Sequence, residues 1–271
     1  MYLDYYGLRE KPFNVTSDPN FLYLSKRHKE AFAHLVYGIK ERKGFLEITG
    51  EVGTGKTTLC RALLNQLDTH TKAAFMFNSD LSELQLLQAI IADLGIKIER
   101  KTKIDLFNSL NSFLIEQLRL GNNVVLILDE AQNLKPRILE QMRMLSNLET
   151  EKEKLFQIIF VGQPELRDRL SSPGLRQLRQ RIGIRYHILP LEINEIADYI
   201  NHRLYVAGSE GDIRFTSTAI ERIYQYSNGI PRLINIVCDK ALLLAFVLRG
   251  YNIDEKIIEK SIEEIEGKVT V

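Results

Sequence analysis

The chain has 271 residues, of which 45% are hydrophobic and 26% are charged, a composition typical of a folded globular protein with one large or two small domains. Its 36 basic and 35 acidic residues leave a formal net charge of +1, which excludes a strong overall attraction to nucleic acid or anionic lipid. The two cysteines, Cys60 and Cys238, exclude a disulfide framework. Together with an N-terminus unlike a signal peptide and no apolar run long enough to span a bilayer, they predict a cytoplasmic chain that does not insert into a membrane.

The first element with a chemical signature is a glycine-rich loop between a predicted strand, Phe45 to Thr49, and a predicted helix, Thr58 to Leu67. The loop fits the pattern G-x-x-x-x-G-K-[ST], whose glycines allow backbone N–H groups to surround a phosphate at a helix N-terminus. We expect Lys56 to reach the β- and γ-phosphates of ATP and the Thr57 hydroxyl to bind Mg²⁺. The residues expected to contact the nucleotide are Gly50, Glu51, Val52, Gly53, Thr54, Gly55, Lys56, Thr57 and Thr58.

Alternating helices and strands follow this loop. A strand is predicted over Ala73 to Phe77. Two apolar stripes then predict helices, one marked by Leu84, Leu87, Ile91 and Leu94, the other by Leu106, Leu110, Phe113, Leu114 and Leu118.

A second chemical motif ends the apolar run Val124 to Leu128, which reads as a strand buried on both faces. Asp129 suits the coordination shell of Mg²⁺, and Glu130 can polarise the attacking water as a general base. An acidic loop after a buried strand is the simpler alternative, but the phosphate loop upstream favours the catalytic pair.

The rest of the chain predicts one more core helix, marked by Leu139, Met142, Leu145 and Leu148, then strands over Leu155 to Val161 and Ile184 to Leu189, and helices alone after Pro190. We therefore expect an α/β nucleotide-binding core with its N-terminal segment at 1–190 and a small helical domain at 191–271. Within that domain Thr216 is a predicted N-cap, Asn228-Gly229 a helix end and Pro231 the first turn of the next helix.

This plan is that of an AAA+ P-loop ATPase, with a parallel five-stranded sheet, helices on both faces and a helical lid. By analogy Gln163 would act as sensor 1, Arg232 as sensor 2, and Arg181, or else Arg179, as the finger that completes a neighbour's site in a homo-oligomer. The simpler readings are a loop glutamine, an exposed helix arginine, and a solvated basic face or nucleic-acid patch. Asn78 could restrain Glu130, or could be a turn residue.

Several specific blocks resemble the general secretion pathway protein A (ExeA/GspA-type) family of AAA+ ATPases over essentially the whole chain. They are Met1 to Leu8, Lys11-Pro12-Phe13, Ser17-Asp18-Pro19, Phe21 to Ser25, Gly50 to Thr58, Leu128 to Leu134, Val161 to Leu166, Leu178 to Ile182 and Gly229 to Arg232.

The resemblance implies an ATPase that helps insert or assemble the type II secretion pore, with a secretion-system or membrane partner protein. It also makes Tyr23 and His28 candidates for enclosing adenine, although a core aromatic and a surface histidine are the simpler readings. Longer family members continue into a membrane-spanning helix and a periplasmic domain, so tethering to the inner membrane is expected if the native chain continues past Val271.

Other functions remain open. Related ATPases serve pilus or exopolysaccharide systems, and ATPases of transposition bind DNA. For DNA, Arg176 to Arg185 with Lys97, Arg100, Lys101 and Lys103 could form a basic surface, although the near-neutral total charge argues against it. A nucleotide-gated binding module with negligible turnover is a third possibility, against which Glu130 argues.

Overall fold

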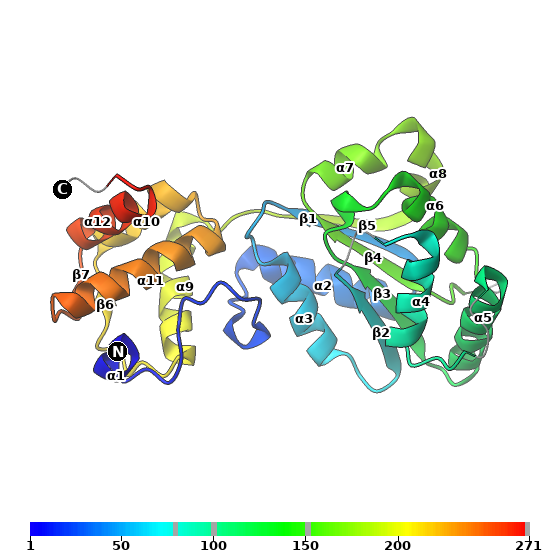
Figure 1. The fold of residues 1–271 in the computed structure, drawn as a ribbon, viewed down its shortest axis with the longest axis horizontal. Coiled ribbons are helices and arrows are strands. Elements are labelled where there is room, and N and C mark those ends of the chain that lie inside the picture. The colour runs from blue at the N-terminus through cyan, green and yellow to red at the C-terminus, as the bar shows by residue number, and fades with distance from the viewer. Residues whose placement is uncertain (78–80, 99–101, 150–152, 269–271) are drawn as a thin grey trace. The chain divides into compact units, whose positions relative to one another are not determined.

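The computed structural model describes residues 1–77, 81–98, 102–149 and 153–268 (Figure 1). They form two compact units whose parts are interleaved along the chain. The helical unit comprises residues 1–28, 51–58 and 189–271, and the α/β unit comprises residues 29–50 and 59–188. The phosphate loop therefore belongs to the same unit as the C-terminal helices. The division into domains at 1–190 and 191–271 stays a prediction.

A five-stranded parallel sheet forms the centre of the α/β unit, as predicted. Its strands are β1 (Phe45–Gly50), β2 (Thr71–Met76), β3 (Asn123–Leu128), β4 (Gln157–Gly162) and β5 (Ile182–Ile188). Their order is β2-β3-β4-β1-β5, and every neighbouring pair is parallel. Strand β4 thus lies between the two strands that carry the sequence motifs. Because the strands are parallel, the chain leaves β1, β3 and β4 at the same edge of the sheet.

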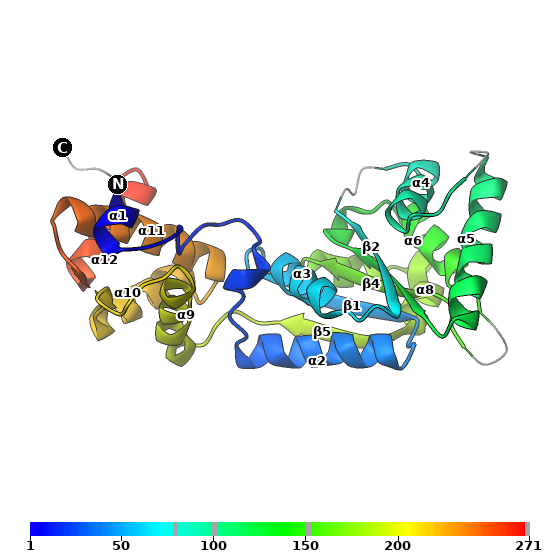
Figure 2. The same cartoon turned by 90° about the horizontal axis from the view of Figure 1, so that it is seen from below.

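Helices cover both faces of this sheet because its central strands are apolar on both sides. Phe45, Leu126 and Phe160 belong to one buried cluster with α4 (Glu83–Asp93), α5 (Lys103–Arg119), α6 (Pro136–Leu145), α7 (Glu165–Leu170) and α8 (Arg176–Arg181). On the opposite face Leu46 lies against Gly38 of α2 (Lys26–Lys40), and α3 (Lys56–Gln66) lies on that side too (Figure 2).

The apolar stripes predicted which segments are helical more accurately than which residues are buried or where each helix ends. Leu84 is 37% exposed, and the buried side of α4 is formed by Leu86, Leu87, Ile90 and Ile91 instead. Leu148 packs against the core but lies beyond the end of α6. A helical stripe identifies a face only to within about one residue, because neighbouring positions at either edge share it.

The helical unit contains α1 (Tyr2–Tyr6), α9 (Ile193–Val206), α10 (Ser217–Ser227), α11 (Pro231–Val247) and α12 (Glu255–Ile265). Two strands of two residues each, β6 (Arg214–Phe215) and β7 (Asn252–Ile253), pair in parallel, so this region is not purely helical as predicted. Thr216 caps α10 by accepting from the Ala219 N–H at 3.2 Å, and Asn228 ends it in the left-handed conformation, as expected.

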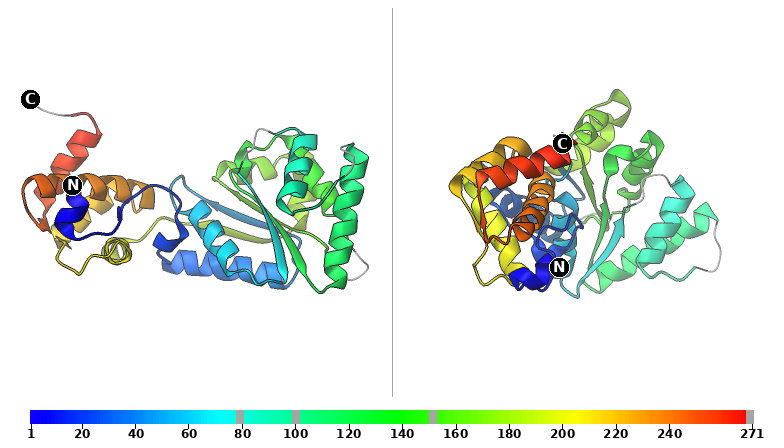
Figure 3. Two further views of the ribbon diagram at one scale, coloured as in Figure 1. Left: turned by 60° about the horizontal axis from the view of Figure 1, so that its bottom comes forward. Right: turned by 60° about the vertical axis from the view of Figure 1, so that its left-hand side comes forward.

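The N-terminal segment is an integral part of the helical unit. Helix α1 packs on α11 (Figure 3). The Tyr2 hydroxyl donates to Asp239 Oδ1 at 2.6 Å. The Tyr6 hydroxyl donates to the Gly250 carbonyl at 2.9 Å. Burial raises the pKa of both phenols, so they stay protonated donors. The segment is thus fixed by contacts to residues more than 230 positions away.

Two predictions from composition can be followed in the structure. Cys60 and Cys238 lie on α3 and α11, neither forms a disulfide and both are fully buried, so they act as small core residues. In the described ranges, no helix has both the length and the apolar character that crossing a bilayer requires.

Candidate functional site

The phosphate loop connects β1 to α3 through two glycines with positive φ. Gly53 has φ of 84° and Gly55 has φ of 88°, a conformation that residues with a Cβ adopt only with strain. The Thr54 N–H donates to the Glu51 carbonyl at 3.3 Å and closes a tight turn inside the loop. Two of the motif's glycines therefore occupy positions where the backbone conformation favours glycine.

Three carbonyls of the loop accept hydrogen bonds, from residues of the loop itself and from His28 and Arg232 of the same helical unit. The Glu51 carbonyl accepts from the Thr54 hydroxyl at 2.8 Å and from Lys56 Nζ at 2.9 Å. The Gly53 carbonyl accepts from the Arg232 N–H at 3.2 Å, and the Thr54 carbonyl accepts from His28 Nε2 at 2.8 Å. Because these carbonyls are engaged, the N–H groups of the loop can face an anion, as phosphate binding requires.

Arg232 is brought to this loop by a tight packing of backbones. Gly229 has φ of 75°, and a Cβ there would lie 2.0 Å from the Leu191 carbonyl oxygen, so only glycine fits before α11. Pro231 then begins the helix, and a Cβ on Gly53 would lie 2.6 Å from the Cβ of Arg232. The first turn of α11 therefore packs directly against the phosphate loop, with the Arg232 side chain exposed.

The two carboxylates follow β3 at the edge of the sheet where the parallel strands end. The Asp129 N–H donates to the Met76 carbonyl at 2.9 Å, and its side chain is buried with 2% exposure. Asp129 Oδ1 accepts from the Glu130 N–H at 2.9 Å. Glu130 itself has φ of 52°, a left-handed conformation that is uncommon for a residue with a side chain. Such strain is often found at functional positions.

Two glutamine side chains meet at Glu130. Oε2 of Glu130 accepts from Gln132 Nε2 at 2.6 Å and from Gln163 Nε2 at 3.3 Å. Gln132 Oε1 in turn accepts from the Gln163 N–H at 3.0 Å. Gly162 makes room for this contact, since a Cβ there would lie 2.7 Å from Gln132 Oε1. The structure therefore brings together Glu130 and Gln163, which the sequence singled out, and Gln132, which it did not.

The oxygen donors predicted for Mg²⁺ suit that ion. Thr57 lies in the first turn of α3, and Asp129 is a buried carboxylate. Hydroxyl and carboxylate oxygens are the hard ligands that Mg²⁺ prefers, usually with waters and nucleotide phosphates completing its shell. In the described part of the chain, no group of three or more His, Cys, Asp or Glu residues could hold a metal ion. Each of the two predicted donors is thus chemically suited to Mg²⁺.

The arginines before and within β5 occupy different environments. Arg181 donates to Ser146 Oγ at 2.9 Å and to Asn147 Oδ1, so its guanidinium braces the end of α6. Arg176, Arg179 and Arg185 line a cavity of about 290 Å³ with Gln180 and Ile182.

A buried glutamate neutralises part of this positive charge. Glu47 lies beside Arg185 in the register of β1 with β5, and its residue is 3% exposed. Its Oε2 lies 3.3 Å from Arg185 Nε, and its Oε1 lies 3.7 Å from Arg167 Nε. Burial raises the pKa of Glu47, whereas the arginines act in the opposite direction. The ion pair links β1, β5 and α7.

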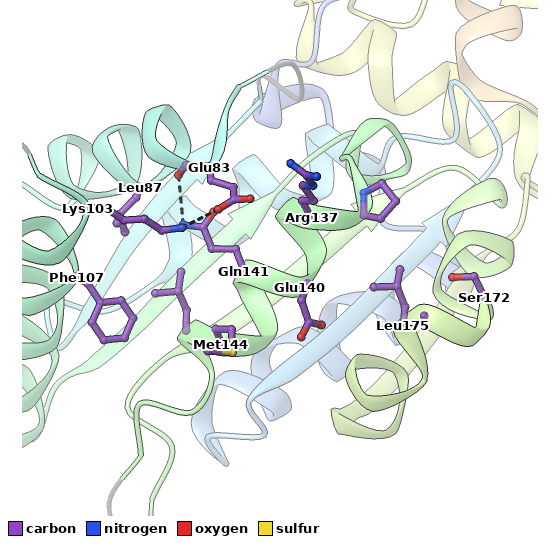
Figure 4. Close-up of a pocket in the computed structure, with 13 residues that line it drawn as sticks. Glu83, Leu87, Lys103, Phe107, Arg137, Glu140, Gln141, Met144, Ser172 and Leu175 are labelled. Carbon is purple, nitrogen blue, oxygen red and sulfur yellow. Dashed lines mark hydrogen bonds and ion pairs between the residues drawn. The ribbon is translucent and has the colours of Figure 1, made fainter.

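A separate cavity of about 720 Å³ lies between α4, α5, α6 and the 3₁₀ turn Pro173–Leu175 (Figure 4). Its walls are mainly apolar, and at one end Lys103 Nζ lies 2.7 Å from Glu83 Oε2. None of the residues predicted for nucleotide chemistry lines it.

The remaining predicted positions have simpler roles or cannot be placed. The Tyr23 ring packs 5.9 Å from Tyr199, as a core aromatic would. His28 is not a surface residue, since it is 3% exposed and binds the phosphate loop. Lys97 is exposed, and Lys103 is paired with Glu83. Asn78, Arg100 and Lys101 lie outside the described residues.

Comparison with known proteins agrees with this arrangement. Residues 39–170 match a family model described as an AAA domain. General secretion pathway protein A of Aeromonas hydrophila is 44% identical over 268 residues, which is 98% of this chain and 49% of that protein. The chain thus spans about half the length of this relative.

Solved structures with low sequence identity share the fold. The ORC2 protein of Aeropyrum pernix, in ADPNP-ADP complexes, has a TM-score of 0.69 at 16% identity and covers 94% of this chain and 72% of its own. The RuvB Holliday junction branch migration motor of Thermotoga maritima has a TM-score of 0.58 at 19% identity and covers 88% of this chain and 68% of its own. With its five-stranded parallel sheet, phosphate loop and AAA-domain match, the chain belongs to the AAA proteins, and over nearly its whole length it is similar to general secretion pathway protein A.

Proposed function

We propose that this chain hydrolyses ATP with Mg²⁺, and that hydrolysis drives assembly or insertion of the envelope apparatus of the general (type II) secretion pathway. The observation that carries the catalytic part is the pair of amide hydrogen bonds that hold Glu130, at 2.6 Å from Gln132 and 3.3 Å from Gln163. A general base must have a defined orientation to take a proton from water, and these amides supply it. The phosphate loop, with its carbonyls engaged, supports the binding part.

Each predicted residue has a role in this proposal. Lys56 and the loop N–H groups bind the phosphates, while Thr57 and Asp129 hold Mg²⁺, which would neutralise charge on the β- and γ-phosphates. Glu130 activates water, and Gln163 orients it through its amide. Arg232, whose N–H already binds the loop, directs its guanidinium to the γ-phosphate.

We further propose that the site is completed by a second copy of the chain. Arg181 or Arg179 of a neighbour would stabilise charge on the transferring phosphoryl group. Their position in α8 and just before β5 supports this proposal, because both side chains are exposed and belong to a strongly positive segment. Activity per molecule should then rise with protein concentration.

The secretion part of the proposal is supported by the Aeromonas relative, whose name states that pathway, and by identity across nearly the whole chain. A partner in the secretion apparatus or membrane is therefore proposed as the trigger or target of hydrolysis. The alternative is an ATPase of a related pilus or exopolysaccharide system. Complementation of a strain that lacks its secretion ATPase distinguishes the two, because only a secretion ATPase should restore secretion.

Phosphate release from Mg-ATP tests the catalytic part. We expect steady turnover by the unaltered chain, no nucleotide binding by Lys56→Ala, and retained binding with kcat reduced by about 100-fold or more in Glu130→Gln. A burst followed by negligible turnover would instead indicate a nucleotide-gated module. Equal rates for Glu130→Gln and the unaltered chain would contradict the assignment of the base.

A DNA-stimulated ATPase is the second candidate, favoured by the arginine-lined cavity of about 290 Å³. One of the structural neighbours is Drosophila ORC bound to DNA, although at 18% identity it bears only on the fold. Phosphate contacts weaken steeply with salt, so binding to duplex DNA should be measured between about 50 and 200 mM salt. Salt-sensitive binding that raises hydrolysis would favour this function, and no binding at low salt would exclude it.

A further inference from the structure

His28 lies at the start of α2, yet its ring reaches into the phosphate loop. Nε2 lies 2.8 Å from the Thr54 carbonyl oxygen, and Nδ1 lies 2.7 Å from Ser25 Oγ. His28 and Thr54 are both buried, at 3% and 0% exposure. A polar ring buried away from water needs a hydrogen-bond partner at each nitrogen, and Thr54 and Ser25 supply these two partners.

The partners determine which nitrogen carries the proton. A carbonyl oxygen can only accept, so Nε2 must donate to Thr54. In the neutral ring Nδ1 is then an acceptor, and the Ser25 hydroxyl must donate to it. Ser25 Oγ also accepts from the His28 N–H at 3.3 Å, which places Ser25 as the N-cap of α2. Ser25 therefore sets both the start of the helix and the tautomer of the ring.

We infer that His28 is a positioning residue for the phosphate loop, holding the Thr54 carbonyl outward so that the N–H groups of the loop face the nucleotide phosphates. The inference rests on the proposed function, in that it requires this loop to bind nucleotide. His28 and the Arg232 N–H bind two adjacent carbonyls of the loop, those of Thr54 and Gly53. Releasing the Thr54 carbonyl would let it turn toward the phosphates, where two negative groups would oppose each other.

This role differs from contact with adenine. The ring nitrogens are both occupied by protein partners, and Gly55 lies close enough that a Cβ on it would be 3.4 Å from Nε2. His28 is consequently packed beneath the loop, and the N-terminal segment that carries it becomes part of the phosphate site.

Substitutions at His28 separate its hydrogen bond from its bulk. His28→Leu fills the space without a donor. His28→Gln places an amide nitrogen near the position of Nε2, whereas His28→Asn carries the same amide on a side chain too short to reach Thr54. His34→Leu, at an exposed histidine of the same helix, is the matched control.

Binding of Mg-ADP, measured by titration calorimetry on variants shown to be folded by thermal melting, is the test. We expect the Kd to weaken about tenfold for His28→Leu and His28→Asn, to stay within about threefold for His28→Gln, and to be unchanged for His34→Leu. In turnover assays, the KM for ATP should rise with Kd while kcat falls less.

The outcomes distinguish this inference from the proposed function. If the unaltered chain binds Mg-ADP and His28→Asn binds it as tightly as His28→Gln does, the positioning role is overturned and the proposed function stands. If the unaltered chain does not bind Mg-ADP, both fall together. Should His28→Leu fail to fold, the comparison of Asn with Gln still decides, because these two differ in reach alone.

Discussion

Glu130 shows how much of a residue's role can be predicted from the amino-acid sequence. Its place after an apolar strand predicted a catalytic carboxylate, and Gln163 was predicted by analogy with AAA+ ATPases, from its place after the strand Leu155 to Val161. Gln132 was overlooked, because a polar residue two positions after a motif has no periodic signal. Only the fold shows that its amide bridges Glu130 and the Gln163 N–H. Sequence can place side chains at a sheet edge, but it does not show which of them hydrogen bond.

Gln132 should therefore influence catalysis more than binding. We expect Gln132→Leu to lower kcat about tenfold, because Glu130 loses its shorter amide contact, with little change in the KM for ATP. Gln132→Glu should be worse, since it places a second carboxylate beside the first. Steady-state phosphate release measures both. An unchanged kcat in Gln132→Leu would mean that Gln163 alone orients the base.

The buried ring of His28 also predicts a pH dependence of stability. Burial lowers the pKa of His28 below its ordinary value of 6.5, against weaker opposing effects of the Thr54 carbonyl and Glu195. The unfolded chain therefore takes up a proton that the folded chain excludes, and stability falls as the pH drops below about 6.5.

Urea unfolding at pH 7.5 and 5.5 measures this dependence. His28→Gln should lose less stability between the two pH values than the unaltered chain does. The comparison between variants is needed because His202, whose pKa is also lowered by burial, contributes in the same direction. Equal losses in the two proteins would show that His28 is not the residue responsible.

At the scale of elements, the strands and helices were predicted wherever an apolar pattern persists for several residues. All five strands of the sheet were anticipated, with ends that differ from the observed ends by about two residues, because hydrogen bonding rather than hydropathy defines a strand end. The pair β6 and β7 could not be anticipated, since two residues carry no period. Glu47 places a charge inside strand β1. The reason for it is visible only once β5 is placed beside β1, because Glu47 then pairs with Arg185.

The link between β1 and β5 can be measured by a double-mutant cycle. Arg185→Ala leaves the buried Glu47 carboxylate with less compensation and should lower the free energy of unfolding by about 1–2 kcal/mol, a figure reduced for the partial exposure of Arg185. In the Glu47→Gln background the same change should cost less than half as much, because no buried charge remains. Additive effects of the two substitutions would rule out a coupled ion pair.

At the scale of the whole molecule, the arginines before β5 raise the question of whether the catalytic site of one copy needs an arginine from a second copy. Arg181 is hydrogen bonded to Ser146 and Asn147 of its own chain, so loss of activity on removing it could reflect a weakened α6 instead of a missing finger. The two explanations differ in whether another copy can restore the activity.

Mixing inactive subunits separates these explanations. Arg181→Ala retains Glu130, and Glu130→Gln retains its arginines, so an equimolar mixture should recover roughly a quarter of the unaltered rate if random neighbours share sites. Arg179→Ala tested in the same way identifies which arginine is donated. Two variants that are each inactive and stay inactive when mixed would argue against a shared site.

The interleaving of the helical unit has a consequence for synthesis on the ribosome. Gly53 and Thr54 are translated early, but the N–H that engages the Gly53 carbonyl belongs to Arg232, and Gly229 must first pack on Leu191 to deliver it. A nascent chain can thus complete much of the α/β unit while its phosphate loop still lacks the hydrogen bond from the Arg232 N–H. A fragment trimmed to residues 39–170 would likewise contain neither His28 nor Arg232. Competence to hold nucleotide would accordingly be acquired late, when the last helices emerge.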